Sequence, residues 1–273
     1  MDLGVTSRAE HLASGLTDAD LRRMMRSGEL MKVRTGWYAT DTADADAVAA
    51  CRRGGCLSCV SALKKHGLWV PPGYASLHVR ATKYDQPRRR DFCRLPGRPL
   101  PIDTILAPIP LALACAARCM ADEDWIAATD SVMNSRRVDS DGLRSQLPYV
   151  SKRMEQLLCR CDPRSQSGTE SLVRDRLRLR GFHVQVQPKI DRVGYVDLKL
   201  GRLLIECDSK LHHTSLESYR NDRRRDRTSA GKKYITMRVT YDDVVYGWDQ
   251  TLNDIRAVTS VGRHRMRSPQ SSP

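Results

Sequence analysis

Hydrophobic positions near the start of the chain follow a helical spacing twice and then change to alternation. Ser7 and Thr17 are placed to cap helices over Arg8–Ala13 and over the run that follows Thr17, because a side-chain oxygen there accepts a hydrogen bond from the first turn. Two short alternating segments, Leu30–Val33 and Gly36–Ala39, come next. The order helix, helix, strand, strand predicts a small winged helix-turn-helix.

The second of these helices has one apolar face and several arginines on its other faces. Leu21, Met24 and Met25 recur at i, i+3 and i+4, which places them on one side of a helix. A helix with arginines on its free face suits a DNA groove. The alternative, a packing module with a solvated basic face, stays open. The DNA-binding candidates in this region are Arg22, Arg23, Arg26 and, in the wing, Arg34.

The middle of the chain predicts a mixed but largely helical region without recognisable catalytic residues. Its role is expected to be packing, dimerisation or positioning. The segment from Cys159 to Gly168 holds Pro, Gly, Ser and Arg and predicts a linker. The predicted elements are helices over Ala43–Cys51, Cys59–Gly67, Pro108–Met120, Trp125–Met133 and Asp141–Leu147, and a strand over Leu77–Ala81.

Beyond this linker the pattern changes to the order helix, three strands, helix, strand. Apolar alternation and short glycine breaks mark the strands, and two of them are expected to form a hairpin over Val193–Asp208. The fold class is therefore α+β or α/β in three parts. The predicted elements are Thr169–Arg180 (helix), Phe182–Lys189 (strand), the hairpin, Ser215–Thr228 (helix), Tyr234–Val239 (strand) and Gln250–Val258 (helix).

Three acidic residues fall within the predicted hairpin. Asp197 is expected in its first strand, and Glu206 and Asp208, two residues apart in the second, are expected to point to one face. Clustered carboxylates repel one another unless a cation lies between them, and oxygen ligands suit Mg²⁺ or Mn²⁺. His213, five residues beyond Asp208, is a candidate proton carrier. The alternative is a surface hairpin whose acids are solvated.

The composition points to an anionic partner. The 273 residues carry a net charge of +14, and the sequence pI is about 9.6. DNA is the expected partner, although a generally basic protein is the alternative. A run of apolar residues long enough for a membrane span is not found, and the first residues lack the pattern of a signal peptide. A cytoplasmic protein without a membrane partner is expected.

Nine cysteines, an odd number, favour reduced thiols. Cys51, Cys56 and Cys59 are spaced as C-x4-C-x2-C, which is compatible with zinc if His66 or Cys93 supplies a fourth ligand. Because Cys59 lies within an apolar helical pattern, buried free thiols are the preferred interpretation.

The N-terminal segment resembles the winged-helix domain of AbiEi-type antitoxin regulators. Lys32 stands where that family usually has arginine. The resemblance implies DNA binding by this segment. The matching positions are Arg8, Glu10, Gly15, Gly28, Leu30, Val33, Gly36 and Tyr38.

The C-terminal part resembles relatives of the very-short-patch repair endonuclease (domain-of-unknown-function family 559), within the PD-(D/E)XK nuclease superfamily. The resemblance implies a restriction-endonuclease-like αβββαβ core. Ser209 and His212 depart from the pattern, which usually has glycine and an aromatic residue there. The matching positions are Ser167, Glu170, Leu177, Gly181, Gln187, Ile190, Val196, Asp197, Ile205, Glu206, Asp208, His213, Asp222, Arg225 and Arg238.

This resemblance assigns roles to the acids. Asp197 and Glu206 would hold the metal ion. Asp208 stands where the superfamily keeps lysine, so it is expected to be a further ligand or to orient a water molecule. Glu170 would complete or orient the ligand shell, and His213 would act as general acid or base in place of the lysine.

The expected positive partners are arginines and one lysine. Arg225 and Arg238 are expected at the phosphate, and Arg223 is a further DNA-binding candidate. Asp222 and Arg225, three residues apart on a helix, are either catalytic or a structural ion pair. Lys199 is a second candidate for the missing cation.

The expected function is therefore a Mg²⁺- or Mn²⁺-dependent DNA endonuclease or nickase, in phage defence, a toxin–antitoxin system or repair. The alternative is a non-catalytic DNA-binding regulator with a nuclease-derived tail. A homodimer is possible. The expected domains are a winged helix (1–40), a middle region (41–160), a nuclease-like domain (161–262) and a disordered tail (263–273).

Overall fold

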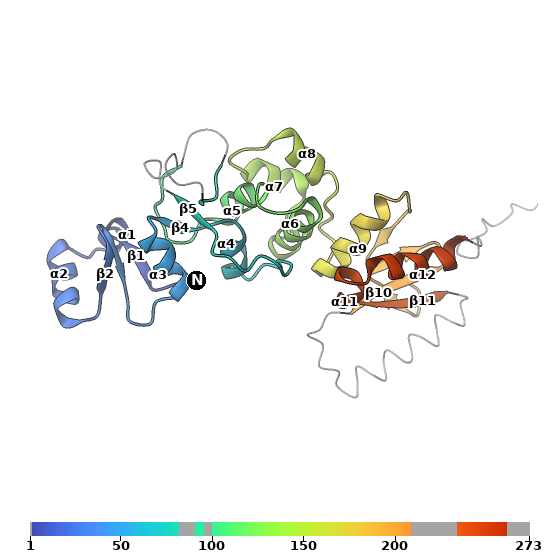
Figure 1. Ribbon diagram of the computed structural model, residues 1–273, viewed down its shortest axis with the longest axis horizontal. Coiled ribbons are helices and arrows are strands. Elements are labelled where there is room, and N and C mark those ends of the chain that lie inside the picture. Colours follow the sequence, from blue (N-terminus) through green and yellow to red (C-terminus); the bar gives the residue numbers. More distant parts are fainter. Residues whose placement is uncertain (1, 82–90, 96–99, 209–233, 261–273) are drawn as a thin grey trace, which may run out of the picture. The chain divides into compact units, whose positions relative to one another are not determined.

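The computed structural model describes residues 2–81, 91–95, 100–208 and 234–260. The chain forms two compact units (Figure 1). Unit 1 comprises Met1–Ala128 and Asp141–Cys159, and unit 2 comprises Thr129–Ser140 and Arg160–Pro273. The described residues form a mixed α/β structure with small sheets, which agrees with the predicted class at this coarse level.

Unit 1 begins with a three-stranded antiparallel sheet in the order β1-β3-β2 and two helices. Both helices begin with the predicted caps, because Ser7 Oγ accepts from Glu10 N at 3.2 Å and Thr17 Oγ1 accepts from Asp20 N at 3.2 Å. β1 was not predicted, since three residues are too few to show alternation. The elements are β1 (Val5–Ser7), α1 (Arg8–Ala13), α2 (Asp18–Ser27), β2 (Met31–Arg34) and β3 (Trp37–Ala39).

The rest of unit 1 packs helices against a two-stranded antiparallel sheet, β4-β5. The strands approach closely at Gly55, where an added Cβ would lie 2.4 Å from the carbonyl oxygen of Arg80. The sequence did not predict β4 or α8. The elements are α3 (Ala45–Arg52), β4 (Gly55–Leu57), α4 (Cys59–Lys65), β5 (Val79–Ala81), α5 (Ile109–Ala116), α6 (Asp122–Arg136), α7 (Ser140–Gln146) and α8 (Lys152–Leu158). The part of α6 from Thr129 on belongs to unit 2.

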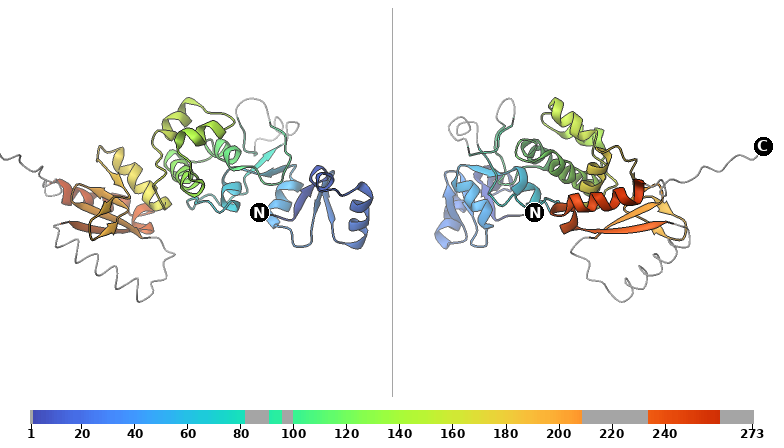
Figure 2. Two further views of the ribbon diagram at one scale, coloured as in Figure 1. Left: turned by 180° about the vertical axis from the view of Figure 1, so that it is seen from behind. Right: turned by 45° about the vertical axis from the view of Figure 1, so that its right-hand side comes forward.

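Unit 2 is built on a four-stranded sheet in the order β11-β10-β9-β6, and Figure 2 shows α12 running alongside it. β10 and β11 are parallel, whereas β6, β9 and β10 are antiparallel neighbours. The elements are α9 (Gly168–Arg178), β6 (Gln185–Val186), β7 (Lys189–Ile190), β8 (Gly194–Tyr195), β9 (Leu198–Leu200), β10 (Leu203–Asp208), β11 (Ile235–Thr240), α11 (Tyr241–Val245) and α12 (Trp248–Ser260).

The predicted hairpin is confirmed as β9 and β10, but it is shorter than expected. Leu203 pairs with Leu200, so two residues form the turn, and the first of them, Gly201, has φ of 60°. Residues before Leu198 instead form the separate β7–β8 ribbon. The predicted continuous strand over Phe182–Lys189 is likewise divided between β6 and β7.

The predicted linker is packed in part: Asp162 and Ser165 are buried, whereas Cys159, Arg164 and Gln166 are exposed. Asp130 and Arg174 form a buried ion pair at 2.7 Å, and both side chains are at most 1% exposed. Asp162, from the predicted linker, donates its backbone N–H to Asp130 at 2.8 Å, and the carbonyl of Arg160 accepts from Arg174 at 2.6 Å. The buried charges need these backbone partners, because an unpaired buried charge is costly.

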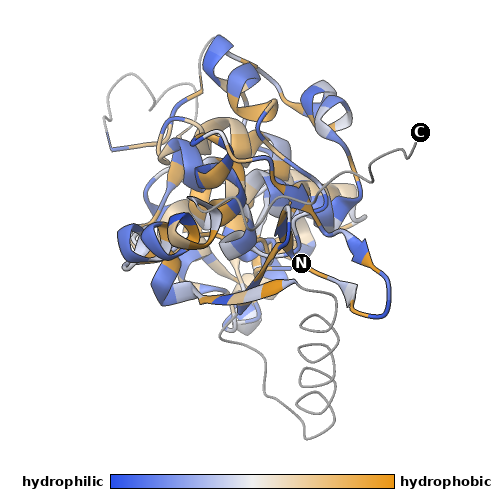
Figure 3. Cartoon of the chain, turned by 90° about the vertical axis from the view of Figure 1, so that its right-hand side faces the viewer, coloured by the Kyte–Doolittle hydropathy of each residue, from blue (hydrophilic) through white to orange (hydrophobic). Residues whose placement is uncertain are grey.

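Hydrophobic residues fill the interiors of both units, and Figure 3 shows that individual helices and strands carry both apolar and polar positions. α5 is buried at nearly every position, although it is a short helix. In the described part of the chain, every helix is too short or too polar to cross a membrane.

Candidate functional site

The carboxylates of the hairpin lie at the end of the sheet where β10 finishes. Glu206 and Asp208 belong to β10, as predicted, and Glu206 is half-buried whereas Asp208 is exposed. Asp197 lies on the bend before β9, not inside a strand as predicted. Its carboxylate turns toward β10, where Oδ2 accepts the backbone N–H of Cys207 at 2.7 Å. This bond holds the Asp197 side chain against β10, next to the last β9–β10 pair, Leu198 with Ile205.

Glu170 reaches the same place from the first turn of α9. It is 1% exposed. Ser167 caps the helix by accepting from Glu170 N at 3.1 Å, and the Glu170 carboxyl accepts from Gln166 N at 2.8 Å. The amide of Gln187 donates to Glu170 at 3.2 Å and to Asp197 at 3.0 Å. One amide group therefore bridges the helix carboxyl and the hairpin carboxyl.

Burial and neighbouring negative charges raise the pKa of two groups at this site, Glu170 and Cys207. Burial, together with the charge of Asp197, raises the pKa of Glu170 to about 8, against hydrogen bonds from Gln166 and Gln187 that favour the charged form. Burial raises the pKa of the Cys207 thiol well above its ordinary value, and the four carboxylates Asp197, Glu170, Glu206 and Asp208 add to this shift. The charges of all four acids therefore act on the Cys207 thiol.

Arg238 lies beside Glu206. The two residues are Cα partners in the parallel pairing of β10 with β11, and Arg238 is exposed. The sequence placed a positive charge here only through resemblance, because the sequence alone does not reveal which strands are neighbours. An exposed guanidinium next to the carboxylates can contact an anionic ligand.

The acids gather without forming a closed ligand group. Among the described residues, the carboxylates of Asp197, Glu206 and Asp208 do not come within 4.8 Å of one another as a set of three. Lys199, the second candidate cation, contacts Gln185 Oε1 at 3.3 Å and lies 6.0 Å from the ring centroid of Tyr234. Four other candidates, His213, Asp222, Arg223 and Arg225, lie outside the described residues.

The DNA-binding candidates of unit 1 divide into two groups. Arg22, Arg23 and Arg26 are exposed on α2, opposite the side that packs with Leu30 and Tyr38. Arg23 is held by Asp20 at 2.8 Å. Arg34 in β2 is half-buried. The exposed arginines of α2 thus form the clearer basic surface.

The residues that the C-x4-C-x2-C spacing offered as an alternative zinc site do not assemble as a group. Cys51 and Cys56 are buried and belong to no group of close ligand atoms among the described residues, and His66 contacts the carbonyl of Ala107 at 2.9 Å. Cys59 and Cys93 do meet, together with two residues that sequence reasoning missed, His78 and Cys119. Their spacing matches no short motif, so no local signal identified them. All nine cysteines have free thiols.

No protein-family model matches this chain, and no curated protein matches it significantly.

Proposed function

We propose that this chain is a metal-dependent DNA endonuclease or nickase whose N-terminal segment, a winged helix, directs it to DNA. The observation that carries the proposal is the Gln187 bridge between Glu170 and Asp197, beside Glu206 and Asp208, at one end of the β9–β10 hairpin. Four acidic groups converge there on a partly open surface, in a protein of net charge +14.

The donor set fits a hard divalent cation. All four groups offer carboxylate oxygens, which Mg²⁺ and Mn²⁺ prefer. The raised pKa of Glu170 means that this carboxyl retains a proton near neutral pH. A nearby cation would favour its charged form. When bound, such an ion activates water and polarises a phosphodiester.

Each residue has a distinct part in the proposal. Asp197 and Glu206 are the proposed main ligands, since Asp197 is fixed by two hydrogen bonds and Glu206 follows in the neighbouring strand. Asp208 is an additional ligand or orients water, and Glu170 orients Asp197 through Gln187. Arg238 contacts the phosphate beside the reacting bond.

Four further residues complete the proposal. His213 is the proton carrier, Asp222 is the helix partner of Arg225, and Arg223 and Arg225 contact phosphates. They lie outside the described residues. Their roles rest on the resemblance alone.

The topology of unit 2 supports a PD-(D/E)XK core. α9 precedes β6, β9 and β10, which are antiparallel neighbours, and β11 then pairs in parallel with β10. The described elements follow the helix, three strands and final strand of the order on which the resemblance was based, whereas the helix expected over Ser215–Thr228 lies outside the described residues. The β7–β8 ribbon is an addition between the first two strands.

The test is nicking of supercoiled plasmid by the full chain with Mg²⁺ or Mn²⁺. Asp197→Asn and Glu206→Gln are compared with Asp249→Asn, an exposed acid on α12 that matches the charge change away from the site. We expect the wild type and Asp249→Asn to nick and the two site variants to lose at least about 100-fold in rate. Equal rates in all four proteins would remove the proposal.

The second candidate function is a DNA-binding regulator without nuclease activity. It is favoured by Asp208, which occupies the position where the superfamily keeps lysine and cannot supply a positive charge. Wild-type protein that binds duplex DNA but leaves plasmid intact with either metal would support this function. Phage defence, toxin–antitoxin control and repair are biological roles compatible with the nuclease.

A further inference from the structure

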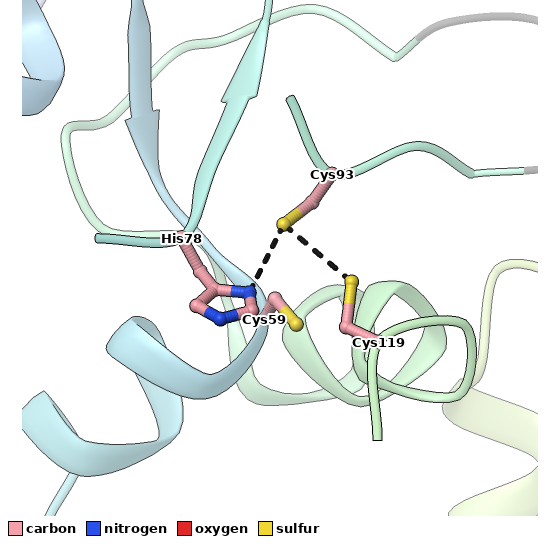
Figure 4. Close-up of side chains that lie close together, drawn as sticks. All are labelled: Cys59, His78, Cys93 and Cys119. Atoms are coloured by element: carbon pink, nitrogen blue, oxygen red, sulfur yellow. Dashed lines mark hydrogen bonds between the residues drawn. The ribbon is translucent and has the colours of Figure 1, made fainter. Parts of the chain in front are cut away.

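A second group of ligating side chains lies in unit 1. Cys59, His78, Cys93 and Cys119 each offer one ligand atom, and these atoms all lie within 4.8 Å of one another. Figure 4 shows the four side chains turned toward a common centre. Within the described part of the chain, this is the only group of three or more His, Cys, Asp or Glu residues whose ligand atoms lie so close together.

The spacing within the group fits one tetrahedral ion. Cys93 Sγ lies 3.8 Å from Cys119 Sγ and 3.4 Å from His78 Nδ1. With Zn–S bonds of about 2.3 Å and a Zn–N bond of about 2.0 Å, tetrahedral geometry places two sulfurs about 3.8 Å apart and a sulfur and a nitrogen about 3.5 Å apart. Both measured separations from Cys93 therefore match the values expected for a shared ion.

The histidine is oriented for ligation by its other ring nitrogen. Nδ1 of His78 faces Cys93, while Nε2 lies 3.3 Å from Ser76 Oγ. A ligating histidine commonly binds a polar group through its second nitrogen, which fixes the ring and its tautomer. The backbone N–H of His78 also donates to Ser61 Oγ at 2.9 Å, which holds the residue just before β5.

The four residues come from four separate segments of the chain. Cys59 begins α4 with φ of 52°, a left-handed conformation that is unusual for a residue other than glycine and is typical of functional positions. Cys93 is tied to β5 through its N–H, which donates to Val79 O at 2.8 Å. Cys119 follows the end of α5. A shared ion would join all four segments.

We propose that Cys59, His78, Cys93 and Cys119 form a structural Zn²⁺ site of the Cys₃His type in unit 1. Three thiolates and one imidazole complete a four-coordinate shell, so the ion holds the fold together and has no open position for a substrate. His78, Cys93 and Cys119 also line an open surface pocket, which provides an entry path for the metal. The site is independent of the proposed nuclease centre.

Two other uses of these thiols fit the geometry less well. A disulfide needs sulfurs about 2.0 Å apart, which is far shorter than the 3.8 Å between Cys93 and Cys119. An iron–sulfur cluster inserts several atoms between its cysteines. Sulfurs this close leave room for one ion only.

The test is the metal content of full-length protein isolated from zinc-supplemented cells. We expect about one zinc ion per wild-type chain. After exchange, we expect cobalt to give the visible absorption of a tetrahedral thiolate-bound Co²⁺. The Cys59→Ala and His78→Ala proteins should contain less than about one fifth of the zinc found in the wild type. Cys51→Ala, which also removes a fully buried sulfur from unit 1, should retain the ion.

The wild-type measurements keep the test decisive if a variant does not fold. Wild-type protein without zinc, or with cobalt that lacks the tetrahedral spectrum, would overturn the proposal. The same holds if Cys59→Ala folds and binds as much zinc as Cys51→Ala, or if mass spectrometry of freshly isolated protein finds Cys93 and Cys119 joined as a disulfide. None of these outcomes depends on nuclease activity.

Discussion

The two proposed ligand groups of this chain differ in the chemistry of their donor atoms. They also differ in how far apart the residues of each group lie along the sequence. The proposed carboxylate site of unit 2 offers oxygen atoms. Three of its residues, Asp197, Glu206 and Asp208, lie close together in the sequence, in the region of one short hairpin. The Cys/His group of unit 1 uses sulfur and nitrogen from Cys59 to Cys119, in four segments. The acids of the first group were predicted from local spacing, whereas the second group became visible only in the fold.

The difference also separates a proposed exchangeable metal from a proposed permanent one. Carboxylates on the surface of unit 2 do not close around a point, and Asp208 is exposed. The thiols of Cys59 and Cys93 are buried, and the four ligand atoms lie within 4.8 Å of one another. We therefore expect catalysis to need added Mg²⁺ or Mn²⁺, and zinc to remain with the protein through purification.

Brief treatment with a chelator should have the largest effect and should act on one group only. Dilute EDTA is expected to reduce plasmid nicking at least about 1,000-fold, because the proposed reaction depends on the exchangeable ion. The Cys/His zinc should stay bound, because three thiolates and an imidazole enclose it. Nicking assays and zinc analysis of the same sample measure both.

Restoration by Mg²⁺ is the control for this treatment. If added Mg²⁺ returns full nicking while zinc content is unchanged, the two groups are functionally separate. Nicking that persists in EDTA, or returns only with Zn²⁺, would contradict the division between a catalytic oxygen site and a structural sulfur site.

The pH dependence of stability should be affected next most strongly, through Glu170. Its pKa is raised from 4.5 to about 8, so between these values the folded protein holds a proton that the unfolded chain has released. The unfolding free energy contributed by this carboxyl therefore falls as pH rises through this window, at up to about 1.4 kcal/mol per pH unit. Glu170→Gln should remove the slope.

This slope is measured by denaturant unfolding in EDTA at pH 6 and pH 8. Between pH 6 and pH 8, we expect the free energy of unfolding of the wild type to fall by about 2 kcal/mol more than that of Glu170→Gln, because only the wild type has a carboxyl group at this position. Asp249→Asn, with an exposed carboxyl, should follow wild type. Parallel curves for wild type and Glu170→Gln would show that the Gln187 bridge does not depend on a protonated Glu170.

The smallest effect concerns the division of labour between the units. Arg22→Ala removes an exposed charge from α2 and is expected to weaken binding to duplex DNA about threefold, with a salt dependence shallower by about one phosphate contact. At saturating DNA the nicking rate should not change, because the proposed chemistry belongs to unit 2. Binding is measured by fluorescence anisotropy across a salt series.

Lys152→Ala removes an exposed positive charge from α8 of unit 1 and serves as the matched control. It should leave both the affinity and its salt dependence close to wild type. If Arg22→Ala and Lys152→Ala have equal effects, the arginine face of α2 has no special role in DNA binding.

Local chemistry was sufficient to predict many of the elements. Ser7 and Thr17 cap α1 and α2 as expected, and Gly201 lies in the turn of the β9–β10 hairpin. These features depend on neighbours within a few residues. Errors arose where elements are very short, as in β1 and β4, because two or three residues carry no periodicity.

The predicted linker shows another limit. Asp162 and Arg160 belong to a stretch rich in turn-forming residues, yet they are needed by the buried pair of Asp130 and Arg174. Composition reports how easily a segment bends. It does not report whether a buried charge elsewhere requires its backbone groups.

The sequence by itself determined the acids of β10 and their shared side of the strand, because alternation has a period of two residues. Only the tertiary structure decided that Gln187 joins Glu170 to Asp197, and that Arg238 lies beside Glu206. It alone brought His78 and Cys119 to Cys59 and Cys93. Helix and strand periods act over a few residues, whereas a ligand group drawn from four segments exists only after the core has packed.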